Sequence, residues 1–351
     1  MTIAGRAVIG ALSLVAPVLA MAGIDAAGGG RTRLTSDLST MQVPAGAPVP
    51  GEIALGRRLF FEPRLSANDR ISCASCHKPE HGFADVERFS VGVSGKPAPR
   101  HTPHLFNLAW APALFWDGRA TSLEEQVLGP LGNSDEMALP AAEAVTKLRG
   151  FADYVAEFRR VYPRDGLTVR TMARAIATFE RSLIAADSPF DRFEAGDSNA
   201  LAADAIRGRE LFYGRARCGT CHSGPDLTDG KFHNTAVPGT DPGRSAFERV
   251  GEFRDRPYPF FQMQRAFKTP GLRNVGLTAP YFHDGSEPTL EGVVRFYNQG
   301  GKQRDGAVSP DVRPLQLSET SIGDLVAFLG SLTSPAGVTA TAQPEARGSR
   351  Q

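Results

Sequence analysis

The sequence has no excess of charge of either sign. Its 351 residues include 39 lysines and arginines against 38 aspartates and glutamates. Because there is neither a basic excess nor a long block of like charges, the composition gives no reason to expect nucleic acid as a partner. With 41% hydrophobic and 22% charged residues, the chain is neither wholly disordered nor fibrous. Its 37 glycines and 26 prolines indicate many loops.

Long apolar runs are missing after the first 22 residues. The run at Ala7–Ala20 follows Arg6 and ends beside an A-x-A cleavage pattern at residues 20–22. Fourteen uncharged residues are few for a membrane span, which favours a cleaved secretory signal over the alternative of an uncleaved anchor. We therefore expect residues 1–22 to be removed on export to the periplasm and the mature form to have no membrane span.

Cysteine is scarce, and four cysteines in a chain of this length do not make a disulfide scaffold. All four belong to two C-x-x-C-H motifs, the attachment signature of c-type haem. Each thiol forms a thioether with a vinyl group, and the histidine supplies an axial nitrogen to the iron. The sequence therefore predicts two covalently bound haem c groups, held by Cys73, Cys76 and His77 and by Cys218, Cys221 and His222.

Three other roles for the cysteines fit the sequence less well. A thioredoxin-like motif would occur once, in a redox βαβ setting. The pairs of a four-cysteine zinc site typically lie 15–20 residues apart, whereas Cys73 and Cys218 are 145 residues apart. Two disulfides would fit an exported protein but give no reason for the histidine after each pair. Haem attachment accounts for both the pairs and the histidines.

The sequences before the two motifs repeat each other. Gly56–Phe60 precedes the first motif and Gly208–Phe212 the second, each predicting a helix that leads into a haem loop. Such a repeat indicates two related haem domains. We place them at residues 51–190 and 200–333, with the boundary in the Ser, Pro, Gly and Asn-containing stretch at 187–199.

Elsewhere the pattern is helical. Apolar residues recur at helical spacing from Val169 to Leu183 and from Ile322 to Leu332, and no convincing alternating strand is present. We therefore expect an all-α, loop-rich fold. Residues 23–50 are interpreted as a flexible leader and residues 334–351 as a loose tail.

The chain resembles the bacterial di-haem cytochrome c peroxidases and their relative MauG, the methylamine-utilisation protein. The resemblance runs from about Gly51 to Thr333. It implies two class I cytochrome c-like domains packed face to face, with peroxide handled at the first haem and electrons relayed by the second. Besides the two haem motifs, the matching segments are Phe115–Ala120, Glu124–Gln126, Glu136–Met137, Leu272–Asn274 and Tyr281–Gly285.

The resemblance also implies roles for three residues around the first haem. Trp116 matches the family's tryptophan between the haems, although a core aromatic is the usual role of a tryptophan. Gln126 and Glu136 match the pair above the peroxide-binding iron, where a carboxylate can move a proton between the peroxide oxygens. Asp135 is the rival base; Glu136 is preferred because it follows Gln126 by ten residues, as in the family.

The axial positions indicate which branch of the family the chain resembles. In the peroxidases a distal histidine blocks the first iron, but here Val93 occupies its position and cannot ligate iron. We therefore expect an open first haem, with three histidines as candidate substitutes that more often make surface or hydrogen-bonding contacts: His81, His101 and His104.

At the second haem the peroxidases have a methionine ligand, where this chain has Tyr297. Helical spacing from Leu290 places Tyr297 on an inward face, which alone indicates a core tyrosine. MauG-like proteins carry a ligating tyrosine there, and a phenolate favours ferric and higher oxidation states. Met263, upstream of the matching segment, is the rival ligand.

A calcium ion between the domains is a further feature of the family. Thr278 and Pro280 match its carbonyl ligands. The position of its asparagine ligand is His101, which disfavours calcium because calcium prefers oxygen.

Two functions follow from the resemblance. One is a MauG-like oxidase that uses hydrogen peroxide to form a high-valent di-haem state and oxidises a protein partner, immature methylamine dehydrogenase, to mature its tryptophylquinone cofactor. The other is a cytochrome c peroxidase that reduces peroxide with electrons from a small cytochrome c or cupredoxin. A plain di-haem electron carrier would need neither Glu136 nor an open iron. Val93, Tyr297 and Met137–Pro140 favour the first.

Overall fold

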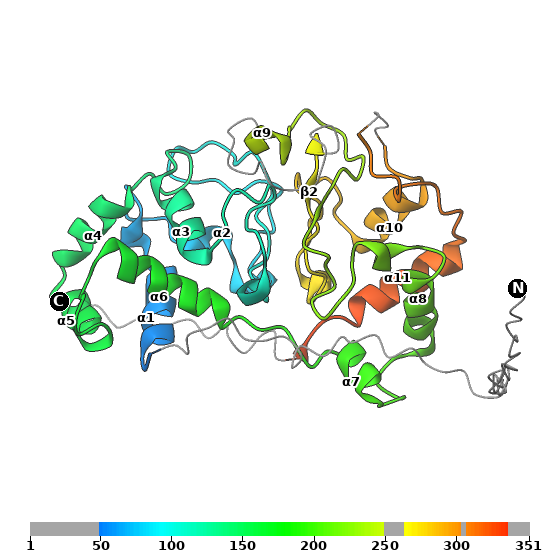
Figure 1. Cartoon of the computed structure of the whole chain (residues 1–351), viewed down its shortest axis with the longest axis horizontal. Coiled ribbons are helices and arrows are strands. Elements are labelled where there is room, and N and C mark those ends of the chain that lie inside the picture. The colour runs from blue at the N-terminus through cyan, green and yellow to red at the C-terminus, as the bar shows by residue number, and fades with distance from the viewer. Residues whose placement is uncertain (1–48, 249–262, 303–306, 336–351) are drawn as a thin grey trace, which may run out of the picture. The chain divides into compact units, whose positions relative to one another are not determined.

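Helices joined by long loops make up most of the chain (Figure 1). The computed structural model describes residues 49–248, 263–302 and 307–335, all within one compact unit, Leu34–Gln351. The α-helices described there are α1 (Glu52–Phe60), α2 (Cys73–Cys76), α3 (Leu123–Gly132), α4 (Ala141–Arg149), α5 (Ala152–Val161), α6 (Val169–Arg181), α7 (Pro189–Ala195), α8 (Ala203–Tyr213), α9 (Ser245–Glu248), α10 (Leu290–Asn298) and α11 (Glu319–Gly330).

The described sheet is minimal. Strands β1 (Phe232–His233) and β2 (Phe267–Lys268) pair antiparallel, with Phe232 opposite Lys268. Short 3₁₀ turns fill some of the loops: η2 (Pro63–Leu65), η3 (Pro79–His81), η4 (Leu108–Trp110), η5 (Cys218–Thr220) and η7 (Val275–Leu277). The helix-rich architecture expected from the sequence is confirmed, with this small sheet as an addition that two-residue strands could not signal by alternation.

Some predicted segments lie outside the described residues. These are the signal at 1–22, nearly all of the leader at 23–50 and most of the tail at 334–351. Among the described helices, none combines the length and apolar character needed to cross a bilayer.

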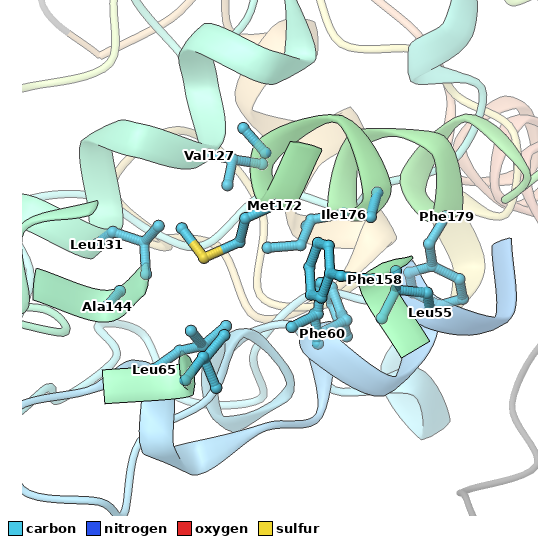
Figure 2. Packing of buried hydrophobic residues seen from close by; sticks show 14 of the residues in the cluster. Leu55, Phe60, Leu65, Val127, Leu131, Ala144, Phe158, Met172, Ile176 and Phe179 are labelled. Atoms are coloured by element: carbon cyan, nitrogen blue, oxygen red, sulfur yellow. The ribbon is translucent and has the colours of Figure 1, made fainter. Parts of the chain in front are cut away.

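Buried apolar residues form two main clusters, one in each half of the chain. The first extends from Leu55 to Ala185 and is built where α1 packs on α6. Figure 2 shows Phe60, Phe158 and Phe179 meeting there. The second extends from Phe190 to Leu332 and forms where α8 packs on α11.

The stretch predicted to hold the boundary, 187–199, contains helix α7. Ser188 caps it by accepting a hydrogen bond from the Asp191 amide, and a proline at its first position is compatible with a helix start. Phe190 on α7 is fully buried in the second cluster. The second core therefore begins earlier than residue 200.

Each main helix pair crosses at a glycine. A Cβ added at Gly56 on α1 would lie 1.8 Å from the Ala175 carbonyl oxygen of α6, and one at Gly208 on α8 would lie 1.9 Å from the Asp324 carbonyl oxygen of α11. Only glycine permits such an approach, so both crossings depend on the absence of a side chain.

We predict that Gly208→Ala destabilises the protein by about 1–3 kcal/mol, because the methyl group must push α8 away from α11. Gly323→Ala on α11 is the matched control, since its Cβ would meet no atom within 4 Å. Alanine is the better helix former, so the control is expected to keep or raise the unfolding temperature. Equal thermal unfolding curves for the two variants would contradict the prediction.

Candidate functional site

The two C-x-x-C-H motifs sit in corresponding places of the two halves. The first begins at α2, where Ser72 and Ser75 form a capping box, and the second begins at η5. An aromatic residue of the preceding helix packs near each motif histidine: the ring centroids of Phe60 and His77 are 6.5 Å apart, as are those of Phe212 and His222. The repeat seen in the sequence is thus a repeat of side-chain geometry.

Both motif histidines are held in one tautomer. His77 Nδ1 lies 2.9 Å from the Phe83 carbonyl oxygen, and His222 Nδ1 lies 3.0 Å from that of Leu227. A carbonyl can only accept, so Nδ1 carries the proton and Nε2 keeps its lone pair. Burial lowers the pKa of both histidines, although these carbonyls oppose the shift. Neutral imidazoles with a free Nε2 fit axial ligation of haem iron.

The cysteines are unpaired in the structure. Burial raises the pKa of Cys73 and Cys76, and it raises the pKa of Cys218 to about 12. These are therefore not the acidic thiols of a redox motif. Within the described residues, Cys221, Asp229 and His233 are the one group of three side chains close enough to share a metal ion, and the group does not unite the two cysteine pairs. The donor set fits two haems better than one zinc site.

The first motif opens into a cavity of about 1040 Å³. Cys73, Cys76 and His77 line it, together with Gln126 of α3 and Glu136 of the loop that follows. The residues matched to the peroxide site by resemblance are thus brought to the same cavity as the first motif.

Glu136 is oriented by its own loop. Asn133 Nδ2 donates a 2.7 Å hydrogen bond to Glu136 Oε1. Burial raises the pKa of Glu136, while Asn133 and the Arg119 guanidinium oppose that shift. Asp135 also lines the cavity, but its side chain is half-exposed and its Oδ1 atom lies 3.7 Å from the Lys96 ammonium. A carboxyl with a raised pKa is suited to proton transfer near neutral pH.

The second motif lines a smaller cavity, of about 240 Å³. Tyr297 of α10 lines it, and burial raises the pKa of its phenol. Thr278 and Pro280, the predicted calcium positions, also line this cavity, whereas Met263 is buried but is not among the lining residues. The geometry therefore places Tyr297, rather than Met263, near the second motif.

Helices α3 and α10 occupy equivalent positions in the repeat. Ser122 caps α3 and Thr289 caps α10, each accepting from the amide three residues on. Seven residues before each cap stands a phenylalanine with positive φ, 64° at Phe115 and 70° at Phe282. Eight residues after each cap stands a cavity-lining side chain, Pro130 in the first half and Tyr297 in the second.

The same register places Gln126 opposite Val293, and both of these residues line their cavities. The first cavity therefore has the Gln126 amide where the second has the aliphatic side chain of Val293. It has Pro130 where the second has the phenol of Tyr297. Aligning the two halves by their helix caps would have shown both differences from the sequence. Such an alignment would have singled out Pro130, which motif reading alone did not.

The segment with Val93 packs beside Glu136. The Val93 amide donates a 2.8 Å hydrogen bond to the Glu136 carbonyl oxygen. A Cβ on Gly92 would lie 2.2 Å from the Asp135 carbonyl, so glycine is needed for this approach. Of the candidate substitute histidines, His101 and His104 line both cavities, while His81 is not among the lining residues of either.

A thin wall separates the cavities, and eight residues line both sides: His101, Thr102, Pro103, His104, Trp116, Lys268, Pro270 and Gly271. Trp116 is fixed there by a 2.8 Å hydrogen bond from its Nε1 to the His101 carbonyl oxygen. The Lys268 amide donates to the Trp116 carbonyl oxygen at 2.7 Å, which joins β2 to the loop of the first half. Sequence reasoning singled out Trp116 but missed Lys268, because a lone lysine in a two-residue strand carries no pattern.

Known proteins resemble this chain over most of its length. A family model described as di-haem cytochrome c peroxidase matches residues 50–199. The methylamine utilization protein MauG of Methylorubrum extorquens is 41% identical over 293 residues, 83% of this chain and 80% of that protein. The cytochrome c551 peroxidase of Pseudomonas aeruginosa is 36% identical over 290 residues, 80% of this chain and 78% of that protein.

Solved structures of two such proteins have folds similar to that of this chain. The crystal structure of a MauG-like protein associated with microbial copper homeostasis superimposes with a TM-score of 0.76 at 30% identity, covering 85% of this chain and 94% of that one. The di-haem peroxidase BthA of Burkholderia thailandensis gives a TM-score of 0.71 at 27% identity, covering 89% and 92%.

Proposed function

Because the chain belongs to the di-haem cytochrome c peroxidase family, we propose that each of the two cavities holds a covalently attached haem c. Family membership makes the chain a haem-dependent oxidoreductase. Cys73, Cys76 and His77 would hold the first haem, in an N-terminal domain. Cys218, Cys221 and His222 would hold the second, in a C-terminal domain that faces the first across the shared wall.

The first cavity is proposed as the peroxide site. When bound, the haem iron supplies the electrons and the Lewis acidity that break the peroxide O–O bond. Glu136 takes the proton from the near oxygen and returns it to the far one, which leaves as water. Gln126 holds the bound peroxide by hydrogen bonding. Reduction to two waters consumes two electrons and two protons for each hydrogen peroxide.

The observation that carries this assignment is the Pro130–Tyr297 pair in the repeat. Proline has no donor atom for iron, and neither does Gly92, which lines the cavity beside Val93, so this side of the first cavity would stay open to peroxide. Tyr297 would close the second cavity by offering a phenolate oxygen to the iron, which favours its higher oxidation states. The first cavity would then react and the second would store and relay oxidising equivalents.

Trp116 is proposed as the relay between the two sites. It lies in the wall with its indole Nε1–H held by the His101 carbonyl. Its ring and the His283 ring meet edge to face, with centroids 6.5 Å apart. A π-system in this position shortens the through-space path between the two cavities.

For the overall reaction we favour a MauG-like oxidation of a protein partner in the periplasm. The partner would be immature methylamine dehydrogenase, and the oxidation would mature its tryptophylquinone cofactor. Tyr297 supports it, together with the 41% identity to a MauG protein. One observation favours the alternative, a peroxidase fed by a small cytochrome c or cupredoxin: both tryptophans of the chain line the first cavity, so none is available on the outer side of the second. A plain electron carrier is disfavoured because it has no use for Glu136. A calcium ion between the domains stays a prediction, and His101 at the position of the asparagine ligand disfavours it.

The two candidate reactions are separated by one comparison. Purified di-haem protein is given hydrogen peroxide with either a reduced small cytochrome c or immature methylamine dehydrogenase. The MauG-like proposal expects quinone absorbance to develop in the second mixture and only slow cytochrome oxidation in the first. Rapid steady-state turnover with the cytochrome, and no quinone, would select the peroxidase.

We predict two haem additions in the intact mass of the mature protein, which should begin near Gly23. The double variants Cys73→Ala/Cys76→Ala and Cys218→Ala/Cys221→Ala should each lose one addition, because each removes both thioether bonds of one haem. A wild-type mass with a single haem would overturn the two-site assignment.

We predict that Glu136→Gln keeps both haems but slows the reaction with peroxide by roughly 10²–10⁴-fold, the usual contribution of general acid–base catalysis. Stopped-flow absorbance measures the rate. Asp135→Asn is the matched control at the neighbouring position and should stay within about threefold of wild type. The reverse result would make Asp135 the base.

We predict that Tyr297→Phe changes the absorption and paramagnetic resonance spectra of the second haem while peroxide still reacts at wild-type rate in the first cavity. Tyr281→Phe is the control, because Tyr281 lines the same cavity but donates its hydroxyl to the Val275 carbonyl at 3.1 Å. Unchanged spectra in Tyr297→Phe would leave Tyr297 as a core tyrosine and would favour the peroxidase alternative.

A further inference from the structure

The helix crossings align the two halves residue by residue. Gly56 meets Ala175 as Gly208 meets Asp324, and four residues on, Phe179 and Phe328 pack against the same glycines. Ser182 and Ser331 then each donate a 2.6 Å hydrogen bond to the carbonyl of that phenylalanine. All three matches have the same offset of 149 residues.

This register pairs Glu180 with Leu329. Glu180 follows Phe179 on α6 and lines the first cavity, and Leu329 follows Phe328 on α11 and lines the second. Both are buried, with 4% and 7% of their surface exposed. The second half therefore builds the same helix and the same cavity wall with an aliphatic side chain, so the fold itself does not require a carboxyl here.

The carboxyl is costly at this position. Glu180 Oε2 is buried without a hydrogen-bond partner. An unpartnered buried carboxyl avoids the cost of a buried charge by keeping its proton. The fold does not need the Glu180 carboxyl, and no partner stabilises its Oε2 atom. This points to a use for the carboxyl in the first cavity.

The charges near Glu180 do not neutralise it. Arg181, the next residue on α6, is engaged by Glu124 of α3 through hydrogen bonds of 2.7 and 2.6 Å. Burial raises the pKa of Glu180 to about 8, with Glu124 adding to the rise and Arg181 opposing it. The Cys73 thiol of α2 is the other titratable group that interacts with Glu180.

On the remaining elements packed against α6, Glu143 of α4 is exposed, and the charged groups named below have other partners. The turn η4 carries no charged residue. On α1 and α4, Glu52 bonds Arg174, Arg57 lies over the Phe61 ring, Arg58 bonds Glu157, Lys147 bonds the Ser66 carbonyl and Arg149 bonds the Leu167 carbonyl.

We propose that Glu180 is a proton-holding residue of the first cavity: its carboxyl takes up a proton when the haem proposed there gains an electron, and releases it when that electron is lost. This rests on the first cavity holding a haem, as in the proposed function. The electron comes from the external reductant and the proton from solvent, so each reduction adds one electron and, between the carboxyl's pKa values in the two redox states, up to one proton. A gained electron removes one positive charge near the carboxyl, which makes the protonated form more favourable.

In the oxidised state the iron carries more positive charge, so Glu180 loses its proton at a lower pH than in the reduced state. Between those two pH values, reduction requires a proton. The reduction potential of the first haem must therefore fall as pH rises through this interval, whereas Leu329 gives the second haem no such dependence.

The test is a spectroelectrochemical titration of the purified di-haem protein between about pH 6 and pH 9, the range around the raised carboxyl value. In wild type, the first-haem potential should become more negative with rising pH. In Glu180→Leu, which copies the side chain of the second half, the dependence should vanish. Glu180→Gln keeps the shape and polarity of the side chain, and should also lose the dependence even if the leucine variant fails to retain its haem.

Asp226→Asn is the matched control. Asp226 is a second buried carboxyl lining the first cavity, with a pKa that burial raises to about 6, but it accepts a 2.7 Å hydrogen bond from Asn107. The dependence should persist in this variant. As a second readout, the reduced-minus-oxidised infrared spectrum should contain a protonated-carboxyl band that is absent in both Glu180 variants.

A dependence that survives in Glu180→Leu or Glu180→Gln, or a wild-type potential that is flat over this range, would overturn the proposal. Loss of the dependence in Asp226→Asn alone would assign the proton to Asp226. The outcome is separable from the proposed function, because the potentials are measured without peroxide or a protein partner. A protein with no peroxide reactivity would still report on Glu180, and a single haem in the intact mass would refute the two-haem proposal directly.

Discussion

The close crossing of two helices at a glycine is the constraint on which each half depends. At Gly56 and at Gly208 the backbone of one helix lies against a carbonyl of the other, and the next turn brings a phenylalanine against the same point. That approach sets the depth at which Phe60 and Phe212 reach the motif histidines, with equal centroid distances of 6.5 Å. The crossing and the aromatic ring beside each motif histidine are therefore repeated together in the two halves.

The wall between the cavities is the second element of the design. It is made from one loop of each half, joined where the Lys268 amide meets the Trp116 carbonyl. Arg100 strengthens the same join, because its guanidinium bonds Asp117 of its own half and Asp241 of the other. Under the proposed function, these contacts fix the spacing of the two redox sites without either haem having to touch the other.

Much of this arrangement could be predicted from the sequence. The motif spacing, the repeated Gly-x-x-Leu-Phe segments and the helical periodicity of Val169–Leu183 identified the helices that carry each site, and the helix-rich fold and the family are confirmed. Helical periodicity cannot show whether a buried side chain has a hydrogen-bond partner, so it did not single out Glu180. The loop-like composition of 187–199, where the boundary is predicted, also did not indicate helix α7, which Ser188 caps.

The pairing of Pro130 with Tyr297 has a consequence for how such a protein can arise. The two halves share crossings, caps and motifs, and they differ in several side chains that line the cavities. Because those side chains stand on helices whose frame is already fixed, a duplicated module can acquire a division of labour by point substitution, with no change of backbone. Under the proposed roles, one half is accessible and the other closed, and this asymmetry rests on side chains carried by helices that both halves share.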